Sequence, residues 1–523
     1  MLLHSFTSKH LKSTFELSAL IYSCFYTSLT KAVLVVKKQA HITKLQRYLA
    51  NAESYKQWSE IAQTLDDALD NQQWKLDPYS DIFNFELLSE RMHALRNLRL
   101  ENNISGLTRA LREGLHHDLG NMGDPRLYNQ CYIGTKRLID DYVDEVCVAL
   151  RYLCDHPKSP MLPAQKLDFF KAVLLSYGRP ALLMSGGASL GAFHLGVVKA
   201  LWERDLLPQV IAGSSAGSII AALLGTHTDE ELPEFFDPES LTLKPWKWAG
   251  VLSGIRGKGF MDQRQLQETI RSYIGDYTMQ EAFEKTGRSV NISVSPVKHN
   301  QKERLLSGYT SPYLLMWSAA LASCAVPTVF PPVQLQQKDE NGRQSAYMPR
   351  LRWVDGSVVS DLPVERLMHL HDVNYSIVSQ TNPHVVPFLK KEHEHSDKLR
   401  HLPGKILKGE LRFHGEAVFD YLRKNTTNSI VRQTSGQMYS LLSQRYKGDV
   451  TLSPSYNLRH YAGVLSNPSA EFISELMLQG ERATWPRLAM INTHAKISKT
   501  LEQCISDLKK SVRAHRATLR VIA

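Results

Sequence analysis

The chain has 523 residues, of which 43% are hydrophobic and 22% are charged, so its composition excludes a disordered or collagen-like chain. The formal net charge of +10 attracts polyanions in general and does not choose between nucleic acid and an anionic membrane. The six cysteines are irregularly spaced and lack a C-x-x-C pair, which argues against a disulfide framework and against a zinc site. We therefore expect a cytoplasmic protein with reduced thiols that is not secreted.

The N-terminal part is expected to form a helical domain over residues 1–155. Residues 17–36 come closest to a membrane span, but Lys31 and several hydroxyl side chains favour a packed or interfacial amphipathic helix. Apolar residues repeat at intervals of three and four in 43–69 and 86–115, as in amphipathic helices. The stretch 155–163, rich in proline and polar residues, reads as a linker or surface loop.

The next part, residues 180–370, alternates between strand and helix patterns. Short apolar or alternating runs predict four strands, at 181–184, 209–212, 289–297 and 375–380. Strands that alternate with helices indicate parallel β-α units covered on both faces. We expect an α/β fold with a mostly parallel sheet, completed by residues 371–523, where helix patterns return over 404–447 and 470–515.

Ser215 is the first candidate for chemistry. Gly213, Ser214, Ser215, Ala216 and Gly217 fit G-x-S-x-G, with an apolar run before them and a small-residue helix pattern after them. A nucleophile placed between strand and helix needs a sharp, strained turn, and Gly213 and Gly217 keep Cβ atoms out of that bend. The alternative is a plain turn rich in glycine and serine.

A second strand-turn-helix pattern precedes the first and offers backbone N–H groups that could converge on an oxyanion. It consists of Gly186, Gly187, Ala188, Ser189, Leu190 and Gly191. The same loop could cradle a dinucleotide phosphate. That interpretation is weaker because Ala188 stands where the middle glycine of G-x-G-x-x-G belongs, and because the next strand ends in the serine turn.

The base is less well marked by local pattern. Asp355 ends a short apolar stretch and precedes the turn glycine Gly356, although an Asp-Gly pair is often only a turn. A conventional triad would use a histidine, for which His369, His371 and His384 are available. The alternative is that Asp355 acts directly on the hydroxyl of Ser215.

Together, GGASLG at 186–191, GSSAG at 213–217 and DGS at 355–357 resemble the patatin-like phospholipases. Longer segments resemble the storage-lipid triacylglycerol lipases of that family, which carry a helical domain ahead of the catalytic one: 309–332, 353–367, 377–389 and 480–488. The resemblance implies a patatin-like α/β/α sandwich in which Ser215 is the nucleophile and Asp355 the proton acceptor. It assigns the oxyanion hole to the backbone of residues 186–191.

Two positions depart from the family pattern. Ala188 replaces a usual third glycine, which is tolerable unless that residue must adopt a positive φ. Leu190 replaces a residue that is often basic in the family.

The resemblance implies hydrolysis of a lipid ester at a membrane or lipid-droplet surface, with triacylglycerol as the expected substrate. A phospholipase A or lysophospholipase and a non-catalytic lipid-binding scaffold are the alternatives. Aromatic and basic residues alternate in 241–261, which suits a membrane interface, although a surface loop with core tryptophans would look the same. No cofactor, metal or nucleic-acid module is expected, and the sequence does not indicate whether the protein has protein partners.

Overall fold

The computed structural model describes residues 36–156, 161–241, 247, 261–297, 303–327, 329–356, 362–389 and 447–522. Most of 17–36, of the proposed interface segment 241–261 and of the helix expected over 404–447 lies outside these residues. Within the described ranges, no helix is both long enough and apolar enough to cross a membrane.

The chain divides into two compact units, of which the first comprises Met1–Lys75 and Cys131–Ile133. Its described part holds helical residues 36–50, α2 (Tyr55–Ala68) and most of α3 (Asn71–Leu76). The buried carboxylate of Asp66 ties the distant segment to these helices, because it accepts hydrogen bonds from the amides of Tyr132 and Ile133 at 2.8 and 3.2 Å. Lys75 pairs with the same carboxylate at 2.8 Å.

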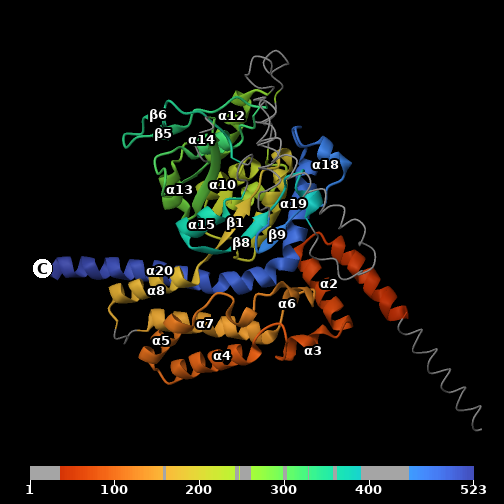
Figure 1. The fold of residues 1–523 in the computed structure, drawn as a ribbon, viewed down its shortest axis with the longest axis vertical. Helices are drawn as coiled ribbons and strands as arrows, with labels where there is room; N and C mark the ends of the chain where they lie inside the picture. The colour runs from red at the N-terminus through yellow and green to blue at the C-terminus, as the bar shows by residue number, and fades with distance from the viewer. Residues whose placement is uncertain are drawn as a thin grey trace, which may run out of the picture. The chain divides into compact units, whose positions relative to one another are not determined.

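The second unit, Leu76–Gln130 with Gly134–Ala523, holds a helical layer and the sheet. The layer comprises α4 (Phe85–Leu100), α5 (Ile104–Gly114), α6 (Pro125–Asn129), α7 (Arg137–Asp155) and α8 (Pro163–Tyr177). The long helix α20 (Leu488–Ile522) contacts α7 and α8 on one side and β1 (Arg179–Met184) on the other. Figure 1 shows α20 running between the sheet and α7.

The main sheet has seven strands in the order β4-β3-β2-β1-β8-β9, with β7 paired to β3. The four predicted strands are confirmed as β1, β2 (Val210–Gly213), β3 (Ser289–Pro296) and β8 (Val373–Ser379). Three short strands escape the sequence pattern: β4 (Arg304–Ser307), β7 (Trp353–Asp355) and β9 (Val450–Leu452). So does the separate hairpin of β5 (Gln336–Lys338) and β6 (Gln344–Ala346).

The predicted mostly parallel arrangement is confirmed: β1 pairs in parallel with β2 and β8, β2 with β3, and β8 with β9. Only β4 and β7 join antiparallel to β3. Consecutive parallel strands connected by helices put all their carboxyl ends at one edge, where the loops after β1 and β2 lie side by side.

Helices cover both faces of the sheet. On one face α10 (Ala216–Thr226) contacts β2 and β3 and packs against α12 (Gln263–Ile274), α13 (Met279–Thr286) and α14 (Met316–Ser323). On the other face α15 (Val364–His371) contacts β1 and β8. Its Leu367 joins a buried apolar cluster with Leu183 and Ala212. The helix α9 (Ala192–Trp202), which follows the glycine loop, packs against α19 (Ala470–Thr484).

Candidate active site

Ser215 lies in the sharp turn that the sequence predicts, between the end of β2 at Gly213 and the start of α10 at Ala216. Its backbone has φ +49° and ψ −121°, and a positive φ is one that residues with a Cβ rarely adopt. Such strain persists only where the surroundings enforce it, and it is common at functional positions. The side chain is only 8% exposed.

The two glycines of the turn are required by close backbone contacts. A Cβ on Gly213 would lie 2.2 Å from the carbonyl oxygen of Gly217, and a Cβ on Gly217 would lie 2.2 Å from that of Met184. Because both contacts are to backbone atoms, no side-chain rotation could relieve them. This local reason for the G-x-S-x-G spacing agrees with the prediction.

Ser323, at the end of α14, holds the turn in place. Its hydroxyl accepts a hydrogen bond from the amide of Ser215 at 2.9 Å and donates one to the carbonyl oxygen of Ser293 in β3 at 2.8 Å. Both serines are buried. Nothing in the sequence singles out Ser323, because a serine in an alanine-rich helix carries no signal of a partner more than 100 residues away.

The strand register places Asp355 beside this turn. Val294 of β3 pairs with Arg304 of β4 and also with Asp355 of β7, so these two strands lie on opposite edges of β3. On the edge of β3 opposite to β4, the first part of β3 pairs with β2. That pairing ends at Ile292, the partner of Gly213. Strand β7 therefore occupies this edge of β3 where β2 has ended. Asp355 consequently lies next to the residues that follow Gly213 in the chain.

Asp355 is fully buried, and its amide donates to the carbonyl oxygen of Ala325 at 3.0 Å. The following residue, Gly356, lies so close to β3 that a Cβ on it would be 2.4 Å from the backbone of Ser293. A glycine is therefore needed directly after the acid for β7 to approach β3.

The thiol of Cys324 interacts with residues on both sides of the candidate site. Burial raises the pKa of this thiol, and the charge of Asp355 raises it further, whereas hydrogen bonds with Ser218 and Ser215 act in the opposite direction. The sulfur lies 4.0 Å from the hydroxyl oxygen of Ser218. One buried side chain thus interacts with both Ser215 and Asp355.

The glycine loop meets the turn from the neighbouring strand β1. A Cβ on Gly191 would lie 2.7 Å from the Cβ of Ala216, the residue after Ser215. Not every amide of the loop is available to a substrate. The amide of Ser189 donates to Val464 at 3.2 Å, and that of Leu190 donates to Gly187 at 3.0 Å.

The two departures from the family pattern have different structural outcomes. Ala188 has φ +51°, so an alanine occupies a left-handed conformation that glycine adopts more readily. Leu190 is fully buried, as an apolar side chain can be and a basic one rarely is.

Replacing Ala188 with glycine is expected to raise the free energy of unfolding by about 0.5 to 1 kcal/mol. The left-handed conformation costs an alanine about 1–2 kcal/mol, and the greater freedom of glycine in the unfolded chain offsets part of that gain. Urea unfolding measures the change. The matched control is Ala192→Gly, at φ −56° in the same segment, which should destabilise the protein. Equal losses of stability in both variants would contradict the expectation.

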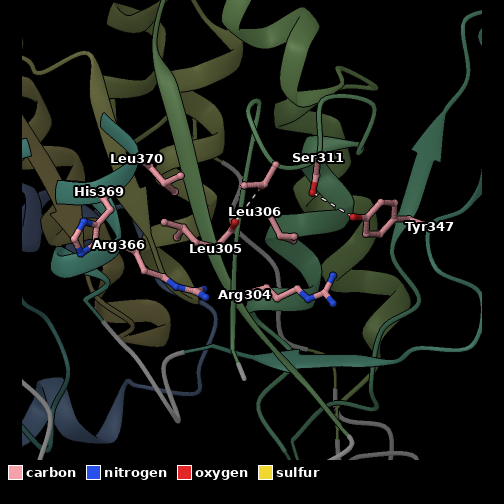
Figure 2. A pocket seen from close by; sticks show the side chains of 9 residues that line it. Arg304, Leu305, Leu306, Ser311, Tyr347, Arg366, His369 and Leu370 are labelled. Carbon is pink, nitrogen blue, oxygen red and sulfur yellow. Dashed lines mark hydrogen bonds between the residues drawn. The ribbon is translucent and has the colours of Figure 1, made fainter. Parts of the chain in front are cut away.

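The histidines considered for a triad lie in different surroundings. His371 is buried, and its Nε2 lies 2.9 Å from Oδ1 of Asn291 in β3. His369 lines a pocket of about 500 Å³ together with Arg304, Arg366 and Tyr347, which Figure 2 shows. Because Arg304 and Asp355 lie on opposite edges of β3, this strand separates the pocket from the candidate base. His384 follows the carboxyl end of β8. Among the described residues, no group of three His, Cys, Asp or Glu side chains could hold a metal ion.

Comparison with known proteins places the chain in a family. Residues 182–368 match the model described as patatin-like phospholipase, and residues 35–174 match a domain of unknown function, DUF3336. Triacylglycerol lipase ptl3 of Schizosaccharomyces pombe is 33% identical over 461 residues, which cover 85% of this chain and 94% of that protein. The chain belongs to the patatin-like phospholipase family. The resemblance seen in the sequence is thereby confirmed, as is the α/β fold that it implies.

Other relatives are longer than this chain. Triacylglycerol lipase SDP1L of Arabidopsis thaliana is 34% identical over 95% of this chain and 62% of its own length. Triacylglycerol lipase 4 of Saccharomyces cerevisiae is 33% identical over 90% of this chain and 53% of its own length. The chain thus spans between about half and two thirds of these two relatives.

Proposed function

We propose that the protein hydrolyses the acyl esters of lipids, with triacylglycerol as substrate, through a dyad of Ser215 and Asp355. The observation that supports this most is the pairing along β3, where β7 takes the edge beyond the end of β2, with Asp355 next to the strained turn of Ser215. Three relatives that are named triacylglycerol lipases support the choice of substrate. We expect that substrate at a membrane or lipid-droplet surface.

In the proposed reaction the carboxylate of Asp355 takes the hydroxyl proton of Ser215 while Oγ attacks the ester carbonyl carbon. The carbonyl oxygen becomes an oxyanion. Asp355 then returns the proton to the leaving alkoxide, which departs as diacylglycerol and leaves an acyl-serine. A water molecule then attacks the acyl-serine while Asp355 takes its proton. The fatty acid is released, and Asp355 returns the proton to Oγ of Ser215, which regenerates the hydroxyl and the carboxylate.

The oxyanion is proposed to bind to the first part of the glycine loop. The amides of Ser189 and Leu190 donate within the protein, and that of Ser215 donates to Ser323, so within the loop we assign the oxyanion to the amides of Gly187 and Ala188. A preorganised donor of this kind typically accounts for about 100- to 1000-fold in rate.

Labelling with a fluorophosphonate tests the chemistry, because this probe forms a covalent bond only with an activated serine. We expect the purified wild type to be labelled and Ser215→Ala not to be. Peptide mapping by mass spectrometry would locate the label and distinguish Ser215 from its neighbour Ser214. An unlabelled wild type would overturn the hydrolase proposal.

Emulsions of triacylglycerol, diacylglycerol and phosphatidylcholine test the substrate. We expect fatty acid release from triacylglycerol by the wild type and none by Ser215→Ala. Release from phosphatidylcholine alone would replace the proposal with a phospholipase A, the second candidate that the family description favours. A labelled protein that releases fatty acid from none of the three lipids would overturn the lipid substrate itself.

A further inference from the structure

A fully buried histidine lies beneath the glycine loop and takes no part in the proposed chemistry. His194 belongs to α9, which begins directly after the loop. Its Nδ1 lies 2.6 Å from the hydroxyl of Ser379, at the end of β8, and its Nε2 lies 3.0 Å from the carbonyl oxygen of Ser185, just after β1. The ring therefore bridges the carboxyl ends of two neighbouring strands under the loop.

The partners determine which nitrogen carries the proton. A carbonyl oxygen can only accept, so Nε2 of His194 must donate to Ser185. Burial lowers the pKa of His194 to about 4, so the ring is neutral at neutral pH and its Nδ1 is an acceptor. The hydroxyl of Ser379 then donates to Nδ1.

Thr381 connects His194 to the glycine loop by hydrogen bonds. Its hydroxyl lies 3.2 Å from Nε2 of His194 and donates to the carbonyl oxygen of Gly186 at 2.9 Å. Because its single proton goes to that carbonyl, its contact with Nε2–H is one in which it accepts. The hydroxyl of Ser185 donates to the same carbonyl oxygen at 2.9 Å and accepts from the amide of Thr381 at 2.8 Å.

The carbonyl oxygen of Gly186 and the amide of Gly187 belong to one planar trans peptide, in which C=O and N–H point in opposite directions. Two hydroxyls that hold the oxygen therefore also set the direction of the Gly187 N–H, which points away from Thr381. Hydrogen bonds to the oxygen polarise the peptide and strengthen its N–H as a donor. A Cβ on Gly187 would lie 2.3 Å from the hydroxyl of Thr381, so the contact requires a glycine.

We infer that His194 and Thr381 are positioning residues for the oxyanion hole: through the carbonyl of Gly186 they orient the amide of Gly187 toward the reacting carbonyl. This inference rests on the proposed function, because it concerns the same oxyanion. Neither side chain touches the substrate. Their effect is on the geometry and strength of a single donor.

The test uses two variants at position 381 that differ in the hydroxyl. Thr381→Val keeps the shape of the side chain and removes the donor to Gly186, whereas Thr381→Ser keeps the donor. With a water-soluble ester, para-nitrophenyl butyrate, we expect kcat of Thr381→Val to fall by about 10- to 100-fold with KM changed by less than about twofold. Thr381→Ser should stay close to the wild type in both constants.

An inhibitor that forms an oxyanion separates orientation from mere folding. An aryl trifluoromethyl ketone adds to an active serine and places a negative oxygen in the hole. Its inhibition constant should rise in Thr381→Val by about the factor by which kcat falls. His194→Phe, which removes both ring nitrogens, should shift the two constants in the same direction. Thermal unfolding would accompany each measurement.

The outcomes distinguish this inference from the proposed function. A wild type that is neither labelled nor active overturns the proposed function. An active wild type whose Thr381→Val variant keeps the same kcat and inhibition constant overturns only the positioning role. The positioning role is also overturned if kcat of Thr381→Val falls only in proportion to the loss of folded protein, while the inhibition constant of the folded fraction stays unchanged.

Discussion

Asp355→Asn is expected to lower kcat by about 100- to 10,000-fold, the range that a positioned general base contributes. Asparagine has nearly the same shape as aspartate, so the pairing of β7 with Val294 and the hydrogen bond to Ala325 should persist. The amide cannot accept the hydroxyl proton of Ser215, so the attack on the ester loses its base. Hydrolysis of para-nitrophenyl butyrate and the rate of fluorophosphonate labelling would measure the loss.

The histidine variants are the control for a conventional triad. We expect His369→Ala and His384→Ala to be labelled at close to the wild-type rate. His371→Ala should lose stability, because its buried partner Asn291 would be left without the ring nitrogen, but its folded fraction should still be labelled. If one of these three variants lost as much activity as Asp355→Asn while remaining folded, a triad would replace the dyad.

Gly196→Ala is expected to lower the free energy of unfolding by about 3 kcal/mol, at the upper end of the range for overpacking. Helices α9 and α19 touch backbone to backbone where they cross. A Cβ on Gly196 would lie 1.8 Å from the carbonyl oxygen of Met477, and a Cβ on Gly480 would lie 2.3 Å from that of Phe193. Because neither obstacle is a movable side chain, the helices must separate. Urea unfolding measures the loss.

Gly106→Ala in α5 is the matched control. There a new Cβ would lie 2.7 Å from a terminal methyl of Leu98 and 2.9 Å from the side chain of Asn103, and both are side-chain ends that can rotate away. Alanine in a helix is about 0.5–1 kcal/mol more favourable than glycine, which offsets the weakening of the capping hydrogen bond from the amide of Gly106 to Asn103. The stability of this variant should therefore change by less than about 1 kcal/mol. A loss of stability in Gly196→Ala no larger than in Gly106→Ala would contradict the close crossing. Gly480→Ala should behave like Gly196→Ala.

The turn that carries Ser215, the proposed nucleophile, could be predicted from the sequence because most of its requirements are local. A short apolar strand, two glycines and a small-residue helix lie within consecutive residues around Ser215. The contact that demands Gly213, with Gly217, arises within that turn, whereas the contact that demands Gly217 is with Met184 of the neighbouring strand β1. The strands β1, β2, β3 and β8 were predicted for a similar reason, because the apolar or alternating run that marks each is continuous in the chain.

Asp355 was a candidate because of its motif and because the three motifs follow one another in the order typical of the family. Its proximity to Ser215, in contrast, depends on the tertiary structure. The strand that carries it has three residues, too few to produce a periodic pattern, and it reaches the site only because β2 ends at Gly213 and frees the edge of β3. The left-handed backbone of Ala188 was likewise left open by the sequence, since an alanine by itself favours other conformations.

The sequence by itself therefore determined the family, the parallel α/β core and the turn of Ser215, all of which depend on residues that are neighbours in the chain. Only the tertiary structure decided which residues support that turn and the glycine loop. Ser323 comes from α14, Thr381 follows β8, and His194 lies in α9. Each holds a backbone group of a distant segment through one directional hydrogen bond, and a single polar residue in a sequence does not indicate its partner.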